Sequence, residues 1–318
     1  MLSVVIPFYN ESGNIPELFR RLDEVLTQHA PDYEIISIDD GSKDDTFMRL
    51  VAEREKNPRI KLVRLSRNFG KEIALSAGLQ HARGAAVVTM DADLQHPPEL
   101  IPEFLARWHE GYKMVYAARV SAKRETWLHT LFAKAFYWFF AKISNLNLPK
   151  GAGDFRLLDR RVVDALNAMP ERTRFMKGLF AWVGFNQIGI PFVPPERFSG
   201  KSGFSFHRLW HFAIDGVAAF STVPLRVWSL LGVIISALSL AYGAFLVIRT
   251  LVFGIDVPGY ASLMVSTLFI GGVQLISLGV IGEYLGRVFE EVKRRPLYLV
   301  SETHGIESPS KPEDASPL

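Results

Sequence analysis

The chain of 318 residues contains no cysteine. It therefore has no disulfide bond and no thiolate-ligated zinc or iron–sulfur centre, so any bound metal must use oxygen or histidine ligands. The lack of cysteine also fits a reducing compartment. Because a typical domain has about 100–150 residues, the length leaves room for one large domain and a smaller part. A small disulfide-stabilised fold is excluded.

Charged residues are absent from two long stretches of the C-terminal third. Residues 227–248 and 257–282 form runs of 22 and 26 residues without Asp, Glu, Lys or Arg. At about 1.5 Å rise per residue, a helix of either length crosses a hydrocarbon core of roughly 30 Å. We expect a hairpin segment at 226–285 with two transmembrane helices, at 227–249 and 258–282. The alternative is an apolar hairpin buried in a soluble core.

Basic residues are scarce between these two runs and frequent on their outer flanks. Arg249 lies in the connection, whereas the outer flanks contain Arg226, Arg287, Lys293, Arg294 and Arg295. Since positive residues favour the cytoplasmic side, we expect an integral inner-membrane protein whose N-terminal region and C-terminal tail are cytoplasmic. The tail, 286–318, is expected to be partly disordered, because it is rich in Ser, Pro and Glu from residue 301 onward.

The formal net charge of +3 does not indicate a nucleic-acid partner, because the basic residues gather beside apolar and aromatic ones. Between residues 119 and 150, Lys and Arg are interleaved with Trp, Phe and Leu, a composition typical of a helix in a membrane interface. We expect interfacial helices near 127–145 and 204–222, with anionic membrane lipids as partners and no nucleic acid. For the first of these helices, the alternative is a core helix with one solvated face.

The first 118 residues alternate between short β-branched runs and stretches with helical periodicity. The expected strands are 3–8, 35–39, 60–65, 86–90 and 114–117, and the expected helices lie near 15–26, 45–56, 71–82 and 99–110. The alternation predicts an α/β domain within 1–225, with a mainly parallel sheet covered by helices on both faces. In such sheets, ligands bind at the carboxyl ends of the strands.

Two glycine-rich motifs that cradle phosphate in many α/β proteins are absent. No Gly-x-Gly-x-x-Gly follows the first expected strand, and no complete Gly-x-x-x-x-Gly-Lys-Ser/Thr occurs. This argues against a dinucleotide-dependent dehydrogenase and against an ATPase. Carboxylates follow the first, second and fourth expected strands instead, in the segments 7–11, 39–42 and 91–95.

Asp91 and Asp93 form an Asp-x-Asp pair after the fourth expected strand. Two carboxylates at this spacing can share a hard divalent cation such as magnesium or manganese, which prefers oxygen ligands and substrate phosphates. The pair therefore predicts a site for Mg²⁺ or Mn²⁺ that would hold a nucleotide diphosphate. The alternative is that both residues only shape a turn.

Several motifs together resemble the family 2 GT-A glycosyltransferases. More narrowly, they resemble the polyprenyl-phosphate group that includes dolichol-phosphate mannose synthase and the bactoprenol glucosyl transferases. The motifs are residues 5–11, 38–46, 68–71, 90–97, 153–157, 197–202, 209–213 and 220–225. The last block, which leads into the two apolar runs, is typical of the bactoprenol branch. The resemblance covers nearly the whole chain and implies a Rossmann-like GT-A catalytic domain.

The resemblance also implies roles for individual residues. Asp154 would be the catalytic carboxylate, assisted by Asp91 and Asp93, which would also bind the metal. The nucleotide-sugar donor would contact Pro7, Tyr9, Glu11, Asp39, Asp40, Asp91, Ala92, Gln95 and Arg119. Either Asp39 or Asp40 would accept a hydrogen bond from the uracil or the ribose. The lipid phosphate or the diphosphate would contact Arg124, Arg197 and Lys201.

These assignments have structural alternatives. Asp154 precedes a helical pattern at residues 155, 158, 162 and 165, where an aspartate N-cap is also expected. The first loop would offer caps at Asn10, Ser12 or Asn14, and Arg119 and Arg197 would be solvated. Relatives often carry an acid where Lys201 stands and a lysine where this chain has Gly203, so Lys201 is ranked below Arg197.

The implied reaction transfers a hexose, with glucose from UDP-glucose as the first expectation, to undecaprenyl phosphate at the cytoplasmic membrane face. The transfer would invert the anomeric carbon and depend on the metal, and Asp154 would act as a base or position a substrate. It would be non-processive, because Arg107-Trp108 lacks the glutamine of the Gln-x-x-Arg-Trp motif in processive relatives.

Several alternatives and partners stay open. The donor could be GDP-mannose, a UDP-N-acetylhexosamine or a UDP-amino-arabinose derivative, and a non-catalytic nucleotide-sugar-binding membrane scaffold is a different class of function. The resemblance also implies a homotetramer, and small residues of the second apolar run permit close helix contacts. A flippase and a downstream glycosyltransferase are further expected partners.

Overall fold

The computed structural model describes residues 1–120, 149, 151–169, 171–172, 174–193, 195, 223–253 and 259–306. The chain divides into two units, one of Met1–Leu209 with Pro296–Leu318 and the other of Trp210–Arg295. The predicted interfacial helices near 127–145 and 204–222 lie outside the described residues, as do Arg124, Arg197 and Lys201.

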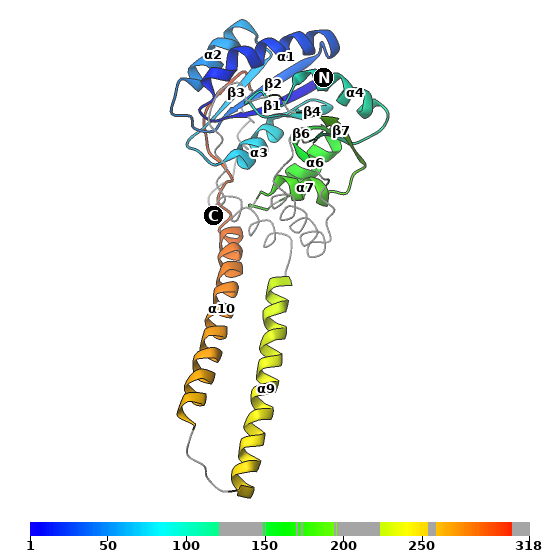
Figure 1. Cartoon of the computed structure of the whole chain (residues 1–318). Coiled ribbons are helices and arrows are strands. Elements are labelled where there is room, and N and C mark those ends of the chain that lie inside the picture. The colour runs from blue at the N-terminus through cyan, green and yellow to red at the C-terminus, as the bar shows by residue number, and fades with distance from the viewer. Residues whose placement is uncertain are drawn as a thin grey trace, which may run out of the picture. The chain divides into compact units, whose positions relative to one another are not determined.

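The first unit is built on a mixed sheet, whose described strands follow the order β7-β5-β6-β4-β1-β2-β3-β8 (Figure 1). The strands are β1 (Leu2–Phe8), β2 (Tyr33–Asp39), β3 (Ile60–Leu65), β4 (Ala86–Thr89), β5 (Met114–Arg119), β6 (Ala152–Asp159), β7 (Gln187–Phe192) and β8 (Val300–His304). Strands β1 to β4 pair in parallel, as do β5 and β7. Strand β6 runs antiparallel to β4 and β5, and β8 runs antiparallel to β3. The predicted mainly parallel α/β fold is confirmed.

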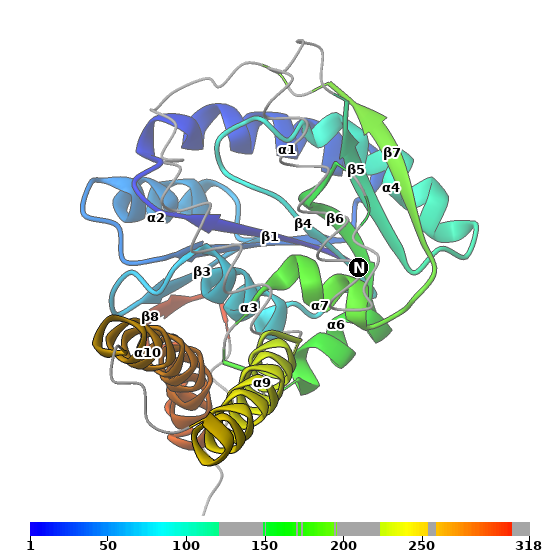
Figure 2. The same cartoon turned by 60° about the horizontal axis from the view of Figure 1, so that its bottom comes forward.

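Helices cover both faces of this sheet (Figure 2). They are α1 (Ile15–His29), α2 (Thr46–Lys56), α3 (Lys71–His81), α4 (Ile101–His109), α6 (Arg160–Ala168) and α7 (Met176–Trp182). Short 3₁₀ turns, η1 (Ser12–Asn14) and η2 (Pro98–Leu100), precede α1 and α4. Figure 2 shows α1 and α4 on one side of the sheet and α3 and α6 on the other. The helices predicted from periodicity are therefore present.

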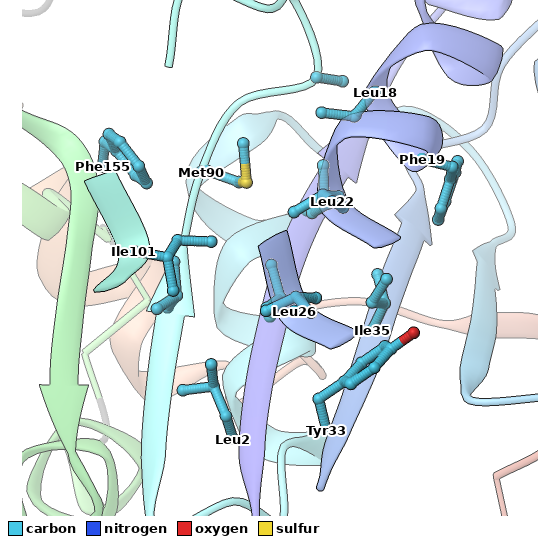
Figure 3. Close-up of a cluster of buried hydrophobic side chains, with 14 of the residues drawn as sticks. Leu2, Leu18, Phe19, Leu22, Leu26, Tyr33, Ile35, Met90, Ile101 and Phe155 are labelled. Carbon is cyan, nitrogen blue, oxygen red and sulfur yellow. The ribbon is translucent and has the colours of Figure 1, made fainter. Parts of the chain in front are cut away.

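The core beneath α1 follows directly from the spacing of its leucines. Leu18, Leu22 and Leu26 recur every four residues, and all three are fully buried. In Figure 3 Leu26 lies beside Leu2 of β1 and Ile35 of β2, and Leu22 and Leu18 follow further along the same face of α1. Full burial of one such side chain contributes about 1.5–3 kcal/mol relative to exposure, so this face alone explains why α1 docks on the sheet.

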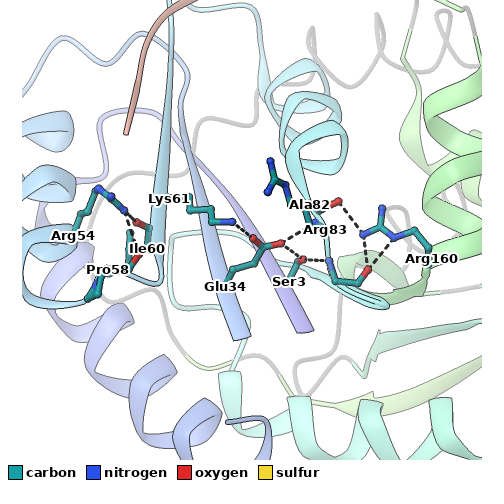
Figure 4. Close-up of polar contacts among 10 residues, drawn as sticks. Ser3, Glu34, Arg54, Pro58, Ile60, Lys61, Ala82, Arg83 and Arg160 are labelled. Carbon is teal, nitrogen blue, oxygen red and sulfur yellow. Dashed lines mark hydrogen bonds and ion pairs between the residues drawn. The ribbon is translucent and has the colours of Figure 1, made fainter. Parts of the chain in front are cut away.

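A buried polar network ties together the N-terminal ends of the central strands (Figure 4). Glu34 of β2 accepts hydrogen bonds from the Ser3 hydroxyl, the Lys61 ammonium and the backbone N–H of Arg83. The Ser3 hydroxyl in turn accepts from the backbone N–H of Gly84 at 2.7 Å. The network joins β1, β2 and β3 to the turn before β4, at the edge of the sheet opposite the carboxyl ends.

The C-terminal tail corrects one prediction. Disorder was expected from residue 301, yet Val300–His304 forms β8 and pairs with β3. The backbone N–H of Ser66 also donates to the carbonyl of Leu299 at 2.9 Å. An edge strand buries little side-chain surface and is ordered by main-chain pairing with its neighbour. A polar sequence can therefore form such a strand without showing an apolar pattern. Residues 307–318 lie outside the described part of the chain.

The second unit contains two long helices, α9 (Val223–Phe253) and α10 (Tyr260–Val292), seen as the paired helices in Figure 1. Both segments that were predicted as transmembrane helices are helical, and α10 continues ten residues beyond the predicted end at 282. That both span a membrane stays a prediction. Apolar side chains along both remain exposed, including Leu238 at 66% and Leu275 at 72%. Among the described residues, Phe269–Val292 is long and apolar enough to cross a membrane. The structure therefore does not show the alternative of an apolar hairpin buried in a soluble core.

Candidate functional site

The predicted acidic residues meet at the carboxyl end of β4. Asp91 follows this strand, and Asp154 is the third residue of β6. Because β6 runs antiparallel to β4, with Thr89 opposite Arg156, its first residues lie beyond the end of β4. The Thr89 hydroxyl donates to the backbone carbonyl of Asp154. Strand direction therefore brings two carboxylates together that are far apart in the sequence.

The alternative of Asp154 as a helix cap is wrong. The segment that looked helical is a strand as far as Asp159, and the helix α6 begins only at Arg160. Asp159 is the N-cap, and its side chain accepts from the backbone N–H of Arg161 at 3.1 Å. Apolar residues at 155, 157 and 158 are buried because β6 has helices on both faces, which hides the period of two.

Lys71 joins the two acidic residues. Its Nζ lies 2.7 Å from Asp91 Oδ1 and 2.9 Å from Asp91 Oδ2, and 2.6 Å from Asp154 Oδ2. Lys71 is the first residue of α3, and the N-cap before it, Gly70, has a φ of 98°. Such a φ favours glycine, so the chain can turn sharply here and direct Lys71 across the carboxyl ends of the strands. Sequence reasoning gave Lys71 no role, although it directly follows a loop at the predicted ligand edge.

The charges of neighbouring side chains, more than burial, determine whether Asp154 and Lys71 are ionised. Burial alone would favour a neutral Asp154, but the positive charges of Lys71 and Lys177 outweigh it and lower the pKa of Asp154 well below its usual range. Burial would also lower the pKa of Lys71, yet Asp154 and Asp91 raise it above its usual range. Asp154 and Lys71 are therefore both charged near neutral pH.

Two further ionisable residues, Arg156 and Glu72, interact electrostatically with Asp154. Arg156 is 1% exposed, donates from Nε to the carbonyl of Gly153 at 2.8 Å, and lies 4.4 Å over the ring of Phe180. Burial lowers its pKa to about 10, against the opposing effect of Asp154. Burial and the charge of Asp154 both raise the pKa of Glu72. Arg156 lies in the motif 153–157, but neither residue was predicted to have a role, because the hydrophobic pattern does not reveal a buried ionisable group.

The Asp-x-Asp segment is held by its own neighbours. The backbone N–H of Asp91 donates to His96 Nδ1 at 2.9 Å, and the ring of His96 stacks on Phe155 at 5.1 Å. The backbone N–H of Gln95 donates to Asp93 Oδ1 at 3.1 Å. His96 thus fixes the main chain from which both aspartates project, a positioning role that the sequence prediction missed.

The donor set fits a hard divalent cation that also binds substrate. Within the described ranges, no group of three or more His, Asp or Glu side chains is arranged to hold a metal ion. Asp91 and Asp93 supply carboxylate oxygens, which suit magnesium and manganese. A cation bound here would need substrate or water oxygens for its other positions, as is usual for magnesium at phosphate sites.

The predicted donor-binding residues Pro7 and Asp39 lie at the carboxyl ends of β1 and β2, and the loops that follow contain Tyr9, Glu11 and Asp40. Tyr9 is 41% exposed, whereas both aspartates are buried. The two oxygens of Asp40 accept from the backbone N–H groups of Phe69 and Gly70 at 2.7 and 2.9 Å, so Asp40 holds the loop before Lys71. Asp39 Oδ1 accepts from the N–H of Ser42 at 3.1 Å, and Arg64 Nε lies 3.3 Å from its other oxygen.

The capping alternative for the first loop is not what the described residues show. Asn14 stands at the N-cap of α1 without a side-chain cap hydrogen bond, and its Nδ2 donates to Glu11 Oε2 at 2.6 Å. Asn10, with a φ of 55°, accepts from the backbone N–H of Lys43 at 2.9 Å. Asn10 therefore ties the first loop to the loop after β2, whereas Asn14 stabilises the first loop itself.

Of the remaining predicted residues, Ala92 is buried and Gln95 is half-buried beside Asp93. Arg119 is the last residue of β5, and its side chain is exposed. Its backbone N–H donates to the carbonyl of Gly151 at 2.9 Å, so it lies next to the start of β6. The predicted carboxylates thus share one edge of the sheet with Arg119, while their roles toward a ligand stay predictions.

Comparison with known proteins identifies this arrangement. Residues 3–166 match the model of glycosyl transferase family 2, and residues 223–288 match that of the GtrB C-terminal hairpin. The chain belongs to glycosyl transferase family 2. It is therefore a glycosyltransferase in which the matched region spans β1 to α6 and the matched hairpin spans α9 and most of α10.

Relatives extend over nearly the whole chain. An uncharacterised glycosyltransferase of Synechocystis sp. is 58% identical over 96% of each chain. A prophage-derived bactoprenol glucosyl transferase of Shigella flexneri is 44% identical over 95% of this chain and 98% of its own. Among solved structures, a mannosyltransferase of Pyrobaculum calidifontis in complex with GDP-Man and Mn²⁺ is 19% identical, with a TM-score of 0.46 over 87% of this chain and 86% of its own.

Proposed function

We propose that this glycosyltransferase transfers glucose from UDP-glucose to undecaprenyl phosphate at the cytoplasmic face of the membrane. The observation that carries the proposal is the pairing of Asp91 and Asp154 through Lys71 at the carboxyl edge of the sheet. The acceptor and the sugar are inferred from the Shigella relatives, whose names state bactoprenol and glucosyl transfer. Both are related to this chain over more than nine-tenths of its length.

The nucleotide sugar would lie over the carboxyl ends of β1, β2 and β4. Of the two aspartates at the end of β2, Asp39 suits the uracil or ribose better. Its Oδ2 accepts no hydrogen bond from the described residues, whereas both oxygens of Asp40 hold the backbone of the loop before α3. Asp91 and Asp93 would hold magnesium or manganese beside the donor diphosphate. When bound, the cation would supply positive charge where negative charge builds on the leaving diphosphate.

Asp154 would orient the acceptor phosphate or the sugar during a single inverting displacement. The lowered pKa of Asp154 makes it a weak base. The acceptor, a phosphate monoester with a second pKa of about 6, is already mostly deprotonated at neutral pH. A base is therefore little needed, whereas alignment of two anionic substrates is. Arg119, Arg124, Arg197 and Lys201 stay predictions as cationic groups that offset the repulsion between those substrates.

The exposed apolar helices support a membrane location. Side chains such as Leu238 and Leu275 would meet lipid rather than water, which removes a large exposed apolar surface. Anchoring through α9 and α10 would keep the catalytic domain close to a phosphate that its lipid tail fixes at the interface. The cytoplasmic orientation of the domain follows from the basic flanks of the hairpin.

Non-processive transfer is supported by the use that the fold makes of Arg107 and Trp108. Trp108 Nε1 donates to Asp159 Oδ2 at 2.8 Å, and Arg107 pairs with Glu110 at 3.0 Å. The first contact joins α4 to the end of β6, the second lies at the C-terminal end of α4, and neither partner is among the predicted site residues. The pair therefore has a structural use here.

The decisive experiment incubates the purified full-length protein with undecaprenyl phosphate, manganese or magnesium, and one labelled nucleotide sugar at a time. We expect labelled lipid from UDP-glucose, with less from GDP-mannose, UDP-N-acetylglucosamine and a UDP-amino-arabinose. Preference for another donor would replace glucose and keep the reaction class. No product from any donor would favour a non-catalytic scaffold that binds nucleotide sugars. Chelation with EDTA should abolish the product, and added Mn²⁺ should restore it.

A further inference from the structure

We propose that Lys71 is a built-in counter-cation, which holds Asp91 in the ligand-free enzyme and moves off it when a divalent cation and the donor bind. The inference rests on the proposed metal site at Asp91 and Asp93. It makes Lys71 a positioning residue that couples metal binding to donor binding, a role that the sequence motifs do not indicate.

The contacts of Asp91 carry the argument. Both of its oxygens lie within 2.9 Å of Lys71 Nζ. Magnesium or manganese would bind such an oxygen at about 2.1 Å, which leaves the ammonium in contact with a second, doubly charged cation. Two cations cannot share both oxygens of one carboxylate without strong repulsion. Binding of the metal to Asp91 therefore requires Lys71 to give up at least one of these contacts.

Lys71 can keep an acidic partner when it leaves Asp91. It already contacts Asp154 Oδ2 at 2.6 Å, and Asp154 Oδ1 is buried without a hydrogen-bond partner in the described part of the chain. The Lys71 side chain is 43% exposed and has four flexible methylene groups, so it can shift without repacking the core. Its main chain stays in place, because Asp40 holds the N–H groups of Phe69 and Gly70 directly before it.

This competition predicts a coupling between the two ligands. Without nucleotide, the metal must displace Lys71 from Asp91, so binding of the metal alone is weakened. A donor diphosphate brings negative charge that can accept the displaced ammonium, so nucleotide should strengthen metal binding. By thermodynamic reciprocity, the metal should strengthen nucleotide binding by the same factor.

The test measures Mn²⁺ binding to the purified full-length protein by electron paramagnetic resonance, with and without UDP. For Lys71→Met, we expect Mn²⁺ affinity without UDP to rise about tenfold, a typical coupling factor, and the gain on adding UDP to shrink accordingly. Lys71→Arg should stay close to the wild type, because it keeps the charge. If Lys71→Met does not fold, judged by its thermal melt, Lys71→Gln replaces it.

Lys177→Met is the matched control. Lys177 acts on Asp154 through its charge. Among the described lysine and arginine side chains only Lys71 contacts Asp91, and His96 Nδ1 lies further away, 3.9 Å from Asp91 Oδ2. The control removes one positive charge near the site without freeing Asp91, so its affinity for Mn²⁺ should rise much less than that of Lys71→Met. An equal rise in both variants would mean general electrostatics and would overturn the inference.

The remaining outcomes separate this inference from the proposed function. If Asp91→Asn abolishes Mn²⁺ binding while Lys71→Met leaves it unchanged or weakens it, the metal site stands and the role of Lys71 is wrong. If the wild type binds no Mn²⁺ with or without UDP, the proposed metal site itself fails. If Lys71 only stabilised the fold, its removal would lower the affinity for Mn²⁺, whereas our inference predicts that its removal raises this affinity.

Discussion

Asp154 is a residue at which burial and charge act in opposite directions. Desolvation favours the neutral acid, yet Lys71 and Lys177 lower the pKa and keep the carboxylate charged. The same cations that keep it charged also make it a weak base, because a low pKa means low proton affinity. We therefore propose that this side chain contributes to the reaction by positioning a substrate rather than by accepting a proton.

Substitution of Asp154 by asparagine tests that argument. Asp154→Asn keeps the size of the side chain but removes the charge that fixes Lys71, so we expect turnover to fall about 100-fold through misplacement. The acid limb of the pH–rate profile should run parallel to that of the wild type, because no protonation of Asp154 limits the rate. Initial rates of lipid-linked product across a pH series measure both effects.

The control for this experiment is Asp164→Asn on α6. Asp164 is 63% exposed and lies 3.6 Å from Arg160, so its loss should leave the rate and the pH profile unchanged. An acid limb that becomes steeper in Asp154→Asn would instead identify Asp154 as a base. A fully active Asp154→Ala would remove it from the mechanism altogether.

At the scale of elements, the antiparallel strand β6 is what assembles the site. A further parallel strand would place its first residues at the opposite edge of the sheet, far from Asp91. Strand β6 begins at the carboxyl edge of the sheet, so its third residue, Asp154, lies beside the end of β4. The loop between β3 and α3 completes the group, since Asp40 holds the backbone that carries Lys71.

The buried network at the opposite edge supports a prediction about stability. Glu34 has a side chain only 3% exposed and three hydrogen-bond donors. In Glu34→Gln, the amide NH₂ must face one of these donors, so a buried polar group loses its partner. We expect the free energy of unfolding at pH 7 to fall by about 1–3 kcal/mol, measured by denaturant titration in detergent. Glu24→Gln, at an exposed pair with Arg20, should change it by less than about 0.5 kcal/mol.

The pH dependence of this difference has a definite sign. Burial opposes ionisation of Glu34, but Lys61, Ser3 and the N–H of Arg83 outweigh it and lower its pKa below 4.5. A lowered pKa in the folded state means that the contribution is complete above pH 4.5 and is lost as the pH falls through the folded value. The gap between the wild type and Glu34→Gln should therefore narrow on acidification below pH 4.5, and a gap that widens would contradict the assignment.

The first five strands were predictable, because β1 to β4 each combine an apolar, β-branched run with a following helical period and β5 continues this alternation. Strands β6, β7 and β8 were not. Strand β6 has buried residues on both faces and leads directly into a helix, so its pattern looks helical. Strand β8 is a half-exposed edge that depends on β3 for its order. Asp91, Asp93 and Asp154 could be selected by resemblance, whereas Lys71 and Glu72 required the arrangement in space.

At the scale of the whole molecule, the hairpin and the catalytic unit solve one problem together. The acceptor phosphate cannot leave the interface, and the nucleotide sugar is soluble, so the enzyme must work where the two meet. We propose that the exposed apolar helices α9 and α10 supply the anchor, and the match to a GtrB C-terminal hairpin covers α9 and most of α10. On this proposal, the basic flanks of the hairpin determine on which side of the membrane the site lies.

The orientation can be tested directly, because the chain has no cysteine and every introduced thiol is therefore unique. Gly259, just before α10, is exposed, and Lys293 directly follows its C-terminal end. If the hairpin spans the inner membrane with both flanks in the cytoplasm, Gly259→Cys should react with a membrane-impermeant maleimide in intact cells. Lys293→Cys should react only after lysis, since the membrane shields the cytoplasmic flank from the reagent. The reverse pattern would place the catalytic unit outside, and labelling of neither or both variants in intact cells would contradict a membrane-spanning hairpin, because α9 and α10 would then not separate the two positions.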